Sequence, residues 1–265
     1  MKMTGNTILI TGGGSGIGRG MAEAFHALGN QVIIAGRRQE VLDSVTAASP
    51  GMKSLTLDIT NAESIRSFAD QISQTYPKLN VLINMAGIMK TENLHHAQDS
   101  LADSEATITT NLLGPIRLTA ALLPTLQAQP QAVVMNVSSG LAFLPLTITP
   151  TYCATKAAIH SYTQSLRYQL KDTNVQVLEL IPPYVQTELM GAHQAHDPMA
   201  MPLSDYITET ISILTNTPDA TEICVERVNL LRFAEANGNY NAFFQQFNDA
   251  MTAAHGGDKP TEAGQ

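Results

Sequence analysis

The sequence has only two cysteines and no long apolar run, and both shortages narrow the classes of protein that it can belong to. Cys153 and Cys224 can form at most one disulfide, and they provide no cluster of metal ligands. Two reduced thiols are typical of cytoplasmic proteins, so we expect that location. No run of about 18 apolar residues is present, and residues 1–6 lead directly into a strand pattern. We therefore expect neither a membrane span nor a signal peptide.

Positive charge is also scarce. The chain contains 15 lysines and arginines against 23 aspartates and glutamates, which gives a formal net charge of −8 at pH 7. Because no basic stripe is present either, we expect neither nucleic acid nor an anionic membrane as a partner. His193 and His196 have a spacing that metal sites use, but no cysteine or carboxylate completes a convincing ligand set. We expect them on a surface loop, with no bound metal.

A glycine-rich segment is the first motif that is present. It lies between a strand pattern at residues 7–10 and a helical pattern that ends at residue 28, and it reads Thr11-Gly12-Gly13-Gly14-Ser15-Gly16-Ile17-Gly18. A second strand pattern at residues 31–35 completes a β-α-β unit, the context of a dinucleotide-binding loop. Glycines let the backbone approach a pyrophosphate, and the helix N-terminus offers unpaired N–H groups. A merely tight turn would not need glycine at positions 12, 16 and 18 together.

The end of the second strand predicts which dinucleotide binds. An acidic residue at this point would accept hydrogen bonds from the adenosine ribose and favour NAD. The sequence has Arg37 and Arg38 there, after Gly36. Cations without a carboxylate suit a 2′-phosphate, so we expect NADP(H) to be favoured, with NAD(H) possible. In the alternative interpretation, both arginines are simply solvated at the start of the next helix.

Strand and helix patterns alternate along the rest of the chain. Strands are expected at residues 53–57, 81–83, 132–137, 175–181 and 222–226, and helices at 62–75, 101–126, 152–170, 228–236 and 240–253. We predict an α/β fold, a Rossmann-type doubly wound parallel sheet of about seven strands in the order 3-2-1-4-5-6-7 with helices on both faces. Residues 1–254 are expected to form one domain, with a lid at about 187–215, C-terminal helices at about 228–254 and a disordered tail at 255–265.

Tyr152 and Lys156 are the first candidates for chemistry. They lie four residues apart in an expected helix and so share one of its faces. A phenol beside an ammonium is more easily deprotonated, so we expect the pKa of Tyr152 to fall towards neutrality. Such a tyrosine can donate or accept a proton near pH 7. The pair alone is a weak signal, because most pairs with this spacing lie on solvated helix faces.

Seven motifs in order resemble those of the short-chain dehydrogenase/reductase family in its compact form. They extend from residue 7 to about residue 190 and comprise Thr11–Gly18, Asp58, Asn84-x-Ala86-Gly87, Asn111, Ser139, Tyr152-x-x-x-Lys156 and Pro182-x-x-Val185-x-Thr187. Ser139 lies 13 residues before Tyr152. This interval is usual in the family and favours Ser139 over Ser138 as the catalytic serine.

The resemblance implies an NAD(P)-dependent oxidoreductase in which the nicotinamide exchanges hydride with a ketone or a secondary alcohol. In such an enzyme Tyr152 would transfer the proton, and Lys156 would lower the pKa of Tyr152 and bond the nicotinamide ribose. Ser139 would hold the substrate oxygen, and Asn111 would interrupt its helix and hold a water on the proton path. The implied cofactor contacts are Gly12, Gly14, Ser15, Gly16, Ile17, Gly18, Arg37, Arg38, Asp58, Ile59, Asn84, Ala86, Gly87, Tyr152, Lys156, Pro182, Val185 and Thr187.

Two positions depart from the family pattern. Met85 stands where the family usually has an asparagine, and Pro183 where it usually has a glycine. The missing amide would leave buried polar groups unpaired, at a cost of about 1–3 kcal/mol. A methionine is flexible enough to fill the space, so we expect lower stability rather than lost activity. Pro183 stiffens the loop after the sixth strand.

The expected substrate side is apolar. The segments 141–146 and 184–201 should face the nicotinamide, and the predicted pocket residues are Leu141, Tyr184, Leu189 and Met190. An apolar, methionine-rich pocket suits a small ketone or secondary alcohol and suits an acidic acyl carrier protein poorly. The alternative for these methionines is ordinary core filling. A non-catalytic dinucleotide-binding regulator and a 3-oxoacyl-type reductase remain as other functions.

The resemblance also implies a homodimer or homotetramer. Family members usually pair through the two long helices that here bear Asn111 and Tyr152. The C-terminal region lacks the glycine-rich ending common in the family, and this difference puts the tetramer in doubt.

Overall fold

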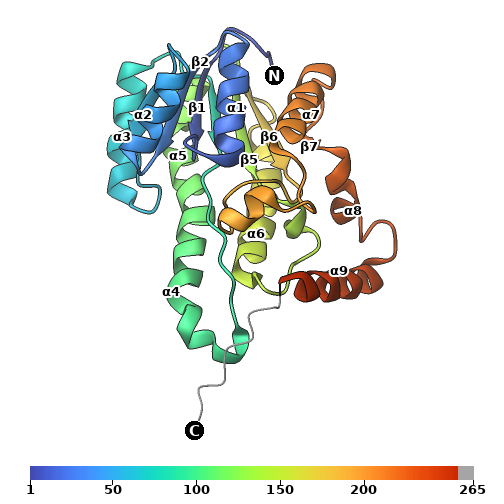
Figure 1. Ribbon diagram of the computed structural model, residues 1–265. Helices are drawn as coiled ribbons and strands as arrows, with labels where there is room; N and C mark the ends of the chain where they lie inside the picture. The colour runs from blue at the N-terminus through green and yellow to red at the C-terminus, as the bar shows by residue number, and fades with distance from the viewer. Residues whose placement is uncertain (256–265) are drawn as a thin grey trace.

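Seven parallel strands form one sheet in the order β3-β2-β1-β4-β5-β6-β7 (Figure 1). The strands are β1 (Thr7–Thr11), β2 (Gln31–Gly36), β3 (Lys53–Thr56), β4 (Val81–Asn84), β5 (Ala132–Val137), β6 (Val175–Ile181) and β7 (Glu222–Cys224). The predicted sheet and its strand order are confirmed. The computed structural model describes residues 1–255, so the tail predicted at 255–265 lies outside this range except for His255.

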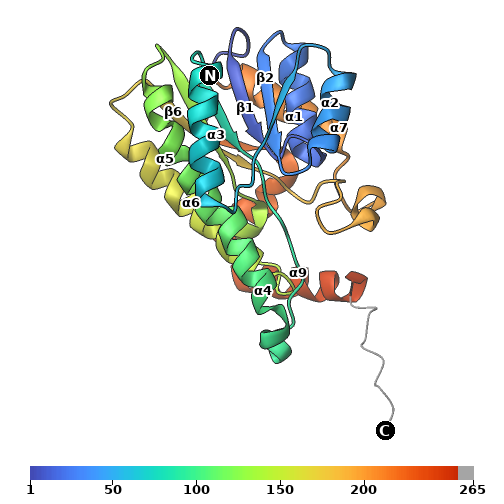
Figure 2. The same cartoon turned by 90° about the vertical axis from the view of Figure 1, so that its left-hand side faces the viewer.

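Helices cover both faces of the sheet (Figure 2). One face carries α1 (Gly16–Ala27), α2 (Gln39–Ala48) and α7 (Leu203–Asn216), and the other carries α3 (Ala62–Thr75), α5 (Gly114–Gln127) and α6 (Pro150–Gln169). Alternate residues of a strand point to opposite faces. Ile8 and Ile10 of β1 therefore pack on the α1 side, while Leu9 packs on the α3 side. This alternation builds two apolar cores from one sheet.

The helix predicted at 101–126 is longer and less regular than expected. It consists of α4 (Ala97–Ile108), a π-helical turn at Thr109–Leu113 and α5. The interruption is the π turn, which contains Asn111 and ends directly before Gly114-Pro115. Because the helix continues without a break from α4 into α5, Pro115 is interior to it, and its missing N–H accounts for the local change in hydrogen bonding. Figures 1 and 2 show α4 projecting beyond the sheet, at the end where α9 also lies.

The region after β6 differs in part from the sequence expectations. Of the segment 187–215, expected to form a lid, the second half is α7, whose Tyr206 is fully buried. His193 and His196 are exposed on a 3₁₀ turn. The helix expected at 228–236 is reduced to α8 (Asn229–Arg232), whereas α9 (Tyr240–His255) forms as predicted. Within the described residues, no helix is both long and apolar enough to cross a membrane.

Candidate active site

The glycine-rich loop after β1 needs its glycines for two geometric reasons. Gly12 and Gly16 have φ angles of +70° and +51°, in the left-handed region that favours glycine. A Cβ on Gly18 would lie 2.3 Å from the carbonyl oxygen of Gly12, and one on Gly12 would lie 2.9 Å from the Cα of Ala86. The glycines therefore allow this tight turn into the N-terminus of α1 and leave most of its backbone bare, which fits a pyrophosphate.

A pocket opens beside this loop at the carboxyl ends of β1, β2 and β4. Eight of the predicted cofactor residues line it: Gly12, Gly14, Ser15, Arg37, Arg38, Ile59, Ala86 and Gly87. The sequence reasoning missed Val41, Leu42, Ile88 and Thr110, which also line it. Val41 and Leu42 are apolar residues in the first turns of α2, directly after the two arginines. Their position after Arg37 and Arg38 could have indicated that they form the apolar side of an adenosine pocket.

Arg37 and Arg38 border this pocket where β2 ends. Both side chains are exposed, and neither makes a hydrogen bond or an ion pair with another described residue. Asp58 lies close to Arg37, but its carboxylate accepts hydrogen bonds from Thr60, from N at 2.9 Å and from Oγ1 at 2.6 Å. The Thr60 bonds, followed by the charge of Arg37, hold the pKa of Asp58 below its usual range.

The other predicted cofactor residues include three that follow β6, namely Pro182, Val185 and Thr187, and two whose side chains pack inside the protein, namely Ile17 and Asn84. Thr187 lies against the loop, because a Cβ on Gly16 would be 3.3 Å from its Cγ2. Val185 is buried and bridges to Met201, and the Pro182 carbonyl accepts a hydrogen bond from Gly140 N at 2.9 Å. Ile17 packs into the apolar cores, and Asn84 points into the protein, where Nδ2 donates to Thr119 Oγ1 and Asn136 Oδ1. The side chain of Asn84 therefore serves the fold.

The backbone at Met85, the first departure from the family pattern, keeps its hydrogen bonds. Thr11 Oγ1 accepts hydrogen bonds from Met85 N at 3.0 Å and from Ala86 N at 3.1 Å. The methionine side chain packs against the core on the α1 side. Asn84 Oδ1 is buried without a partner, so one unpaired polar atom lies next to this position in the chain.

Asn111, Ser139, Tyr152 and Lys156 are all buried and meet at the carboxyl ends of β4 and β5. The Ser139 hydroxyl accepts a hydrogen bond from Leu141 N at 3.2 Å and lies close enough to the Tyr152 phenol to lower the pKa of Tyr152. Lys156 Nζ lies 5.5 Å from the centre of the Tyr152 ring and donates to the Val137 carbonyl at 2.8 Å. The four predicted catalytic residues therefore converge on one site.

Asn111 is held by the chain that follows β4. Its Oδ1 accepts from Ile88 N at 2.9 Å, and its Nδ2 donates to the Ile88 carbonyl at 2.8 Å. A Cβ on Gly87 would lie 3.3 Å from Asn111 Oδ1 and 3.8 Å from Lys156 Nζ. Gly87 therefore leaves open the space that separates these two side chains.

Burial dominates the pKa values at this site. Desolvation raises the pKa of Tyr152 well above its usual value, although the neighbouring Ser139 hydroxyl lowers it. Desolvation also lowers the pKa of Lys156 to about 8, while the Glu179 carboxylate raises it. The prediction that the pKa of Tyr152 falls is wrong for this structure. Burial penalises the phenolate, and the Lys156 ammonium donates to the Val137 carbonyl.

An apolar cluster surrounds Tyr152 on the substrate side. Its buried members are Met89, Leu146, Tyr152 and Cys153, and Leu141, Ile148, Met190, Phe247 and Met251 pack against them. Of the predicted pocket residues, Leu141 and Met190 belong to this cluster. Leu189 is exposed, and the Tyr184 hydroxyl donates to Asp197 Oδ2 at 3.0 Å. Met89 was missed, although its place shortly after the Asn84–Gly87 motif was a usable signal.

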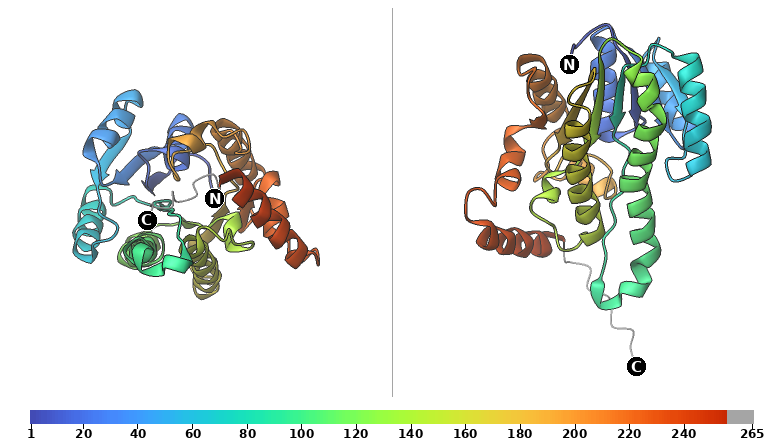
Figure 3. Two further views of the ribbon diagram at one scale, coloured as in Figure 1. Left: turned by 60° about the horizontal axis from the view of Figure 1, so that its bottom comes forward. Right: turned by 180° about the vertical axis from the view of Figure 1, so that it is seen from behind.

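Helix α9 reaches this cluster from the far end of the chain (Figure 3). Asn248 Oδ1 accepts from Thr147 N at 2.7 Å, and its Nδ2 donates to the Pro145 carbonyl at 3.1 Å. These bonds fasten α9 to the loop after Ser139. Phe247 and Met251 of α9 thereby reach the residues around Tyr152.

A family model described as short chain dehydrogenase matches residues 6–198, which include the glycine-rich loop and all four buried residues. The chain belongs to the short-chain dehydrogenase family. As a member it is an NAD(P)-dependent oxidoreductase with the Rossmann-type fold described above.

Relatives of this short-chain dehydrogenase cover nearly its whole length. It is 38% identical over 251 residues to the uncharacterized oxidoreductase DltE of Bacillus subtilis (strain 168), with 94% of this chain and 98% of that protein covered. A short chain dehydrogenase from Burkholderia cenocepacia J2315, solved in complex with NADP, has a TM-score of 0.76 and 24% identity, with 96% and 98% covered. A short chain dehydrogenase/reductase from Burkholderia phymatum, solved with NAD, has a TM-score of 0.76 and 21% identity, with 91% and 96% covered. The two structural likenesses support the fold.

Proposed function

We propose that this dehydrogenase is an NADP(H)-preferring enzyme that reduces small, largely apolar ketones and oxidises the corresponding secondary alcohols. The observation that carries the proposal is that Ser139, Tyr152 and Lys156 are buried together at one site, with Lys156 Nζ 5.5 Å from the centre of the tyrosine ring. This group adjoins a pocket with a glycine-lined backbone cradle that fits a dinucleotide. A dinucleotide-binding protein without catalysis would have no use for the three side chains together.

The proposed mechanism assigns a proton-handling task to each side chain. When bound, the nicotinamide supplies or accepts the hydride. Tyr152 donates its phenolic proton to the carbonyl oxygen, and Ser139 holds that oxygen and stabilises the charge that develops on it. Lys156 places a positive charge beside the Tyr152 phenol. Asn111 holds a water on the path by which a proton returns to Tyr152. Because burial raises the pKa of Tyr152, the phenol carries its proton at neutral pH and can donate it to a carbonyl oxygen.

The substrate class follows from the cluster around Tyr152. Its neighbours are aliphatic, aromatic or thioether side chains, including Met89, Leu141, Met190 and Phe247. Such a surface stabilises an apolar substituent by about 25 cal/mol for each Å² buried and offers no charge to an acidic carrier. Assays with a series of aliphatic and aromatic ketones, followed by nicotinamide absorbance, test this choice. Higher kcat/KM for charged ketones than for apolar ones of equal size would contradict it.

The proposed preference for NADP(H) rests on the two arginines at the end of β2. Replacing Arg37 with aspartate removes a cation for the 2′-phosphate and adds an acceptor for ribose hydroxyls. We expect the ratio of kcat/KM for NADPH to that for NADH to fall about 100-fold, since charge-assisted hydrogen bonds contribute about 1.5–3 kcal/mol. Arg66→Asp, at an exposed position of α3 on the other face of the sheet, is the matched control. Equal losses with both cofactors in Arg37→Asp would contradict the assignment.

A homodimer or homotetramer is the proposed assembly, in a cytoplasmic setting that suits two free cysteines. Helix α4 exposes Leu101 (48%) and Ile108 (40%), which are seven residues apart and share a face. Figure 3 shows the α4–α5 column beside α6. We expect size-exclusion chromatography with light scattering to give an oligomer at micromolar concentration and Leu101→Glu/Ile108→Glu to give a monomer. A monomeric wild type would contradict the proposal.

A further inference from the structure

A row of polar side chains crosses four strands at one register, and the proposed mechanism uses none of its carboxylates. Asn84 of β4 is opposite Asn136 of β5, Asn136 is opposite Glu179 of β6, and Glu179 is opposite Glu222 of β7. These four residues are called the polar row below. Residues at one register of a sheet point to the same face, and Glu179 bonds to His160 of α6. Asn136 also donates to Thr163 of α6. The two central residues of the polar row therefore lie under α6, the helix that carries Tyr152 and Lys156.

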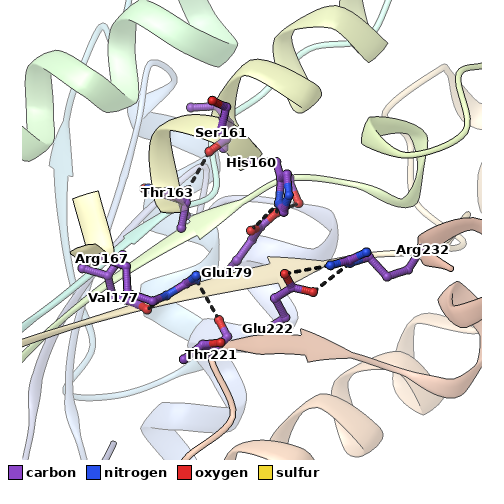
Figure 4. Close-up of polar contacts among 12 residues, drawn as sticks. His160, Ser161, Thr163, Arg167, Val177, Glu179, Thr221, Glu222 and Arg232 are labelled. Carbon is purple, nitrogen blue, oxygen red and sulfur yellow. Dashed lines mark hydrogen bonds and ion pairs between the residues drawn. The ribbon is translucent and has the colours of Figure 1, made fainter. Parts of the chain in front are cut away.

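Glu179 is the fully buried member of this row that carries a carboxylate. Its Oε1 accepts a hydrogen bond from Ser138 Oγ at 2.5 Å, and His160 Nδ1 lies 3.0 and 2.8 Å from its two oxygens (Figure 4). A buried carboxylate is costly unless it is paired and hydrogen-bonded. Here both carboxylate oxygens have hydrogen-bond partners, which hold the negative charge in place. One of these partners is Ser138, the residue before Ser139.

The fixed charge acts on Lys156. The lysine donates to the carbonyl of Val137, which is opposite Leu180, the residue after Glu179. The Lys156 ammonium and the Glu179 carboxylate therefore both lie near the carboxyl ends of β5 and β6. Burial lowers the pKa of Lys156 to about 8, and the Glu179 charge opposes this fall. Glu222, one strand further, is paired instead with Arg232 at 2.7 and 3.0 Å.

We propose that Glu179, held by Ser138 and His160, is the buried counter-charge of Lys156 and a positioning residue for the turn that carries Ser139. The proposal rests on the role of Lys156 in the proposed function. The groups that face Glu179 are His160 and Lys156 from α6, Cys224 and Glu222 from β7, and Arg232 from α8. Arg232 is hydrogen-bonded to Glu222 and reaches Glu179 only through its charge, while Glu179 also acts on Lys156.

A metal ion is the alternative occupant of this cluster. The ligand atoms of His160, Glu179 and Glu222 lie within 4.8 Å of one another. However, the Arg232 guanidinium already occupies the cation position at Glu222, and it stacks on the Phe143 ring at 4.3 Å. Binding a metal would require this packed side chain to leave. The geometry therefore favours a role in holding charge within the protein.

The test is the pH dependence of ketone reduction in Glu179→Gln, which keeps the shape of the side chain and removes its charge. Without the carboxylate, Lys156 should lose its proton at lower pH. We expect the alkaline limb of the kcat profile to move down by about one pH unit, with KM for the ketone changed less than about twofold. Glu179→Asp, which keeps the charge, should return the limb towards its wild-type position.

Glu222→Gln is the matched control, because it removes a carboxylate from the adjacent strand at the same register. Its alkaline limb should coincide with that of the wild type. A wild-type alkaline limb in Glu179→Gln together with an unshifted stability profile, or an equal shift of the limb in Glu222→Gln, would overturn the proposal. Stoichiometric zinc in the purified wild type, bound tightly enough to resist dialysis and lost in Glu179→Gln, would also overturn it in favour of the metal site.

A second readout does not depend on catalysis. The rise in thermal stability that accompanies deprotonation of Lys156 should begin at lower pH in cofactor-free Glu179→Gln than in the wild type. A shift in stability without a shift in the kcat profile would refute the role of Lys156 in the proposed function while leaving the counter-charge intact.

If neither variant at position 179 folds, Ser138→Ala decides the positioning role. It should lower kcat about tenfold at an unchanged alkaline limb, and an unchanged kcat would overturn that role.

Discussion

Replacing Tyr152 with phenylalanine should lower kcat for ketone reduction by a factor of about 10²–10⁴, the usual contribution of a positioned general acid. The variant loses one hydroxyl and leaves the ring in its apolar cluster. NADPH binding, measured by fluorescence, should change less than about twofold, because the glycine-lined loop and both arginines are untouched. The chain has no tryptophan, so the protein adds little background to that signal.

Tyr162→Phe is the matched control for this experiment. Tyr162 lies on the same helix, α6, but packs against the core on the α3 side, away from Ser139. Its variant should keep near-normal turnover. If Tyr152→Phe also turned over ketones at close to the wild-type rate, the proton donor would have to be another group.

Replacing Lys156 with methionine should inactivate the enzyme and flatten the pH dependence of its stability. The folded-state pKa of Lys156, about 8, lies below the ordinary lysine value of 10.5. The buried ammonium therefore destabilises the fold fully below pH 8, and the penalty disappears as the pH rises to 10.5. At 1.36 kcal/mol per pKa unit, the free energy of unfolding of the wild type should rise by about 3 kcal/mol relative to the variant across this window.

Urea unfolding at a series of pH values measures this difference directly. Other lysines and tyrosines titrate in the same range, but they are common to both proteins and cancel in the comparison. Parallel stability curves for the wild type and Lys156→Met would show that the ammonium carries no burial penalty. Lys171→Met, which changes an exposed lysine just after α6, should give a curve parallel to that of the wild type.

The sheet could be predicted from the sequence because its signals are local. The apolar runs at 7–10 and 31–35 are strands on their own evidence, and the glycines between them set the turn that leads into α1. Asn61 precedes α3, and its side chain accepts hydrogen bonds from Glu63 N at 2.8 Å and Ser64 N at 3.0 Å, as asparagine commonly does at a helix N-cap. The four buried residues of the site were predicted from the resemblance of their motifs to those of the family, which needs no knowledge of packing.

Features that depend on three-dimensional packing could not be predicted. The pKa of Tyr152 was expected to fall because the sequence shows a neighbouring lysine but not the degree of burial. Glu179 stands out as a carboxylate in the apolar strand 175–181, yet its partners Ser138 and His160 come from other elements. The place of α9 was equally hidden, because Asn248 reaches the carbonyl of Pro145, 103 residues earlier in the chain.

The polar row also bears on how the strands align as the chain folds. A slip of one residue between β5 and β6 would turn Glu179 to the opposite face of the sheet, among the side chains that pack against α1 and α7. There the carboxylate would lose Ser138 and His160 and lie unpaired in an apolar core, at a cost of several kcal/mol. Asn136 would be penalised in the same way by a slip against β4. The side chains beneath the active site therefore select one register for four parallel strands, where apolar residues alone would fit several.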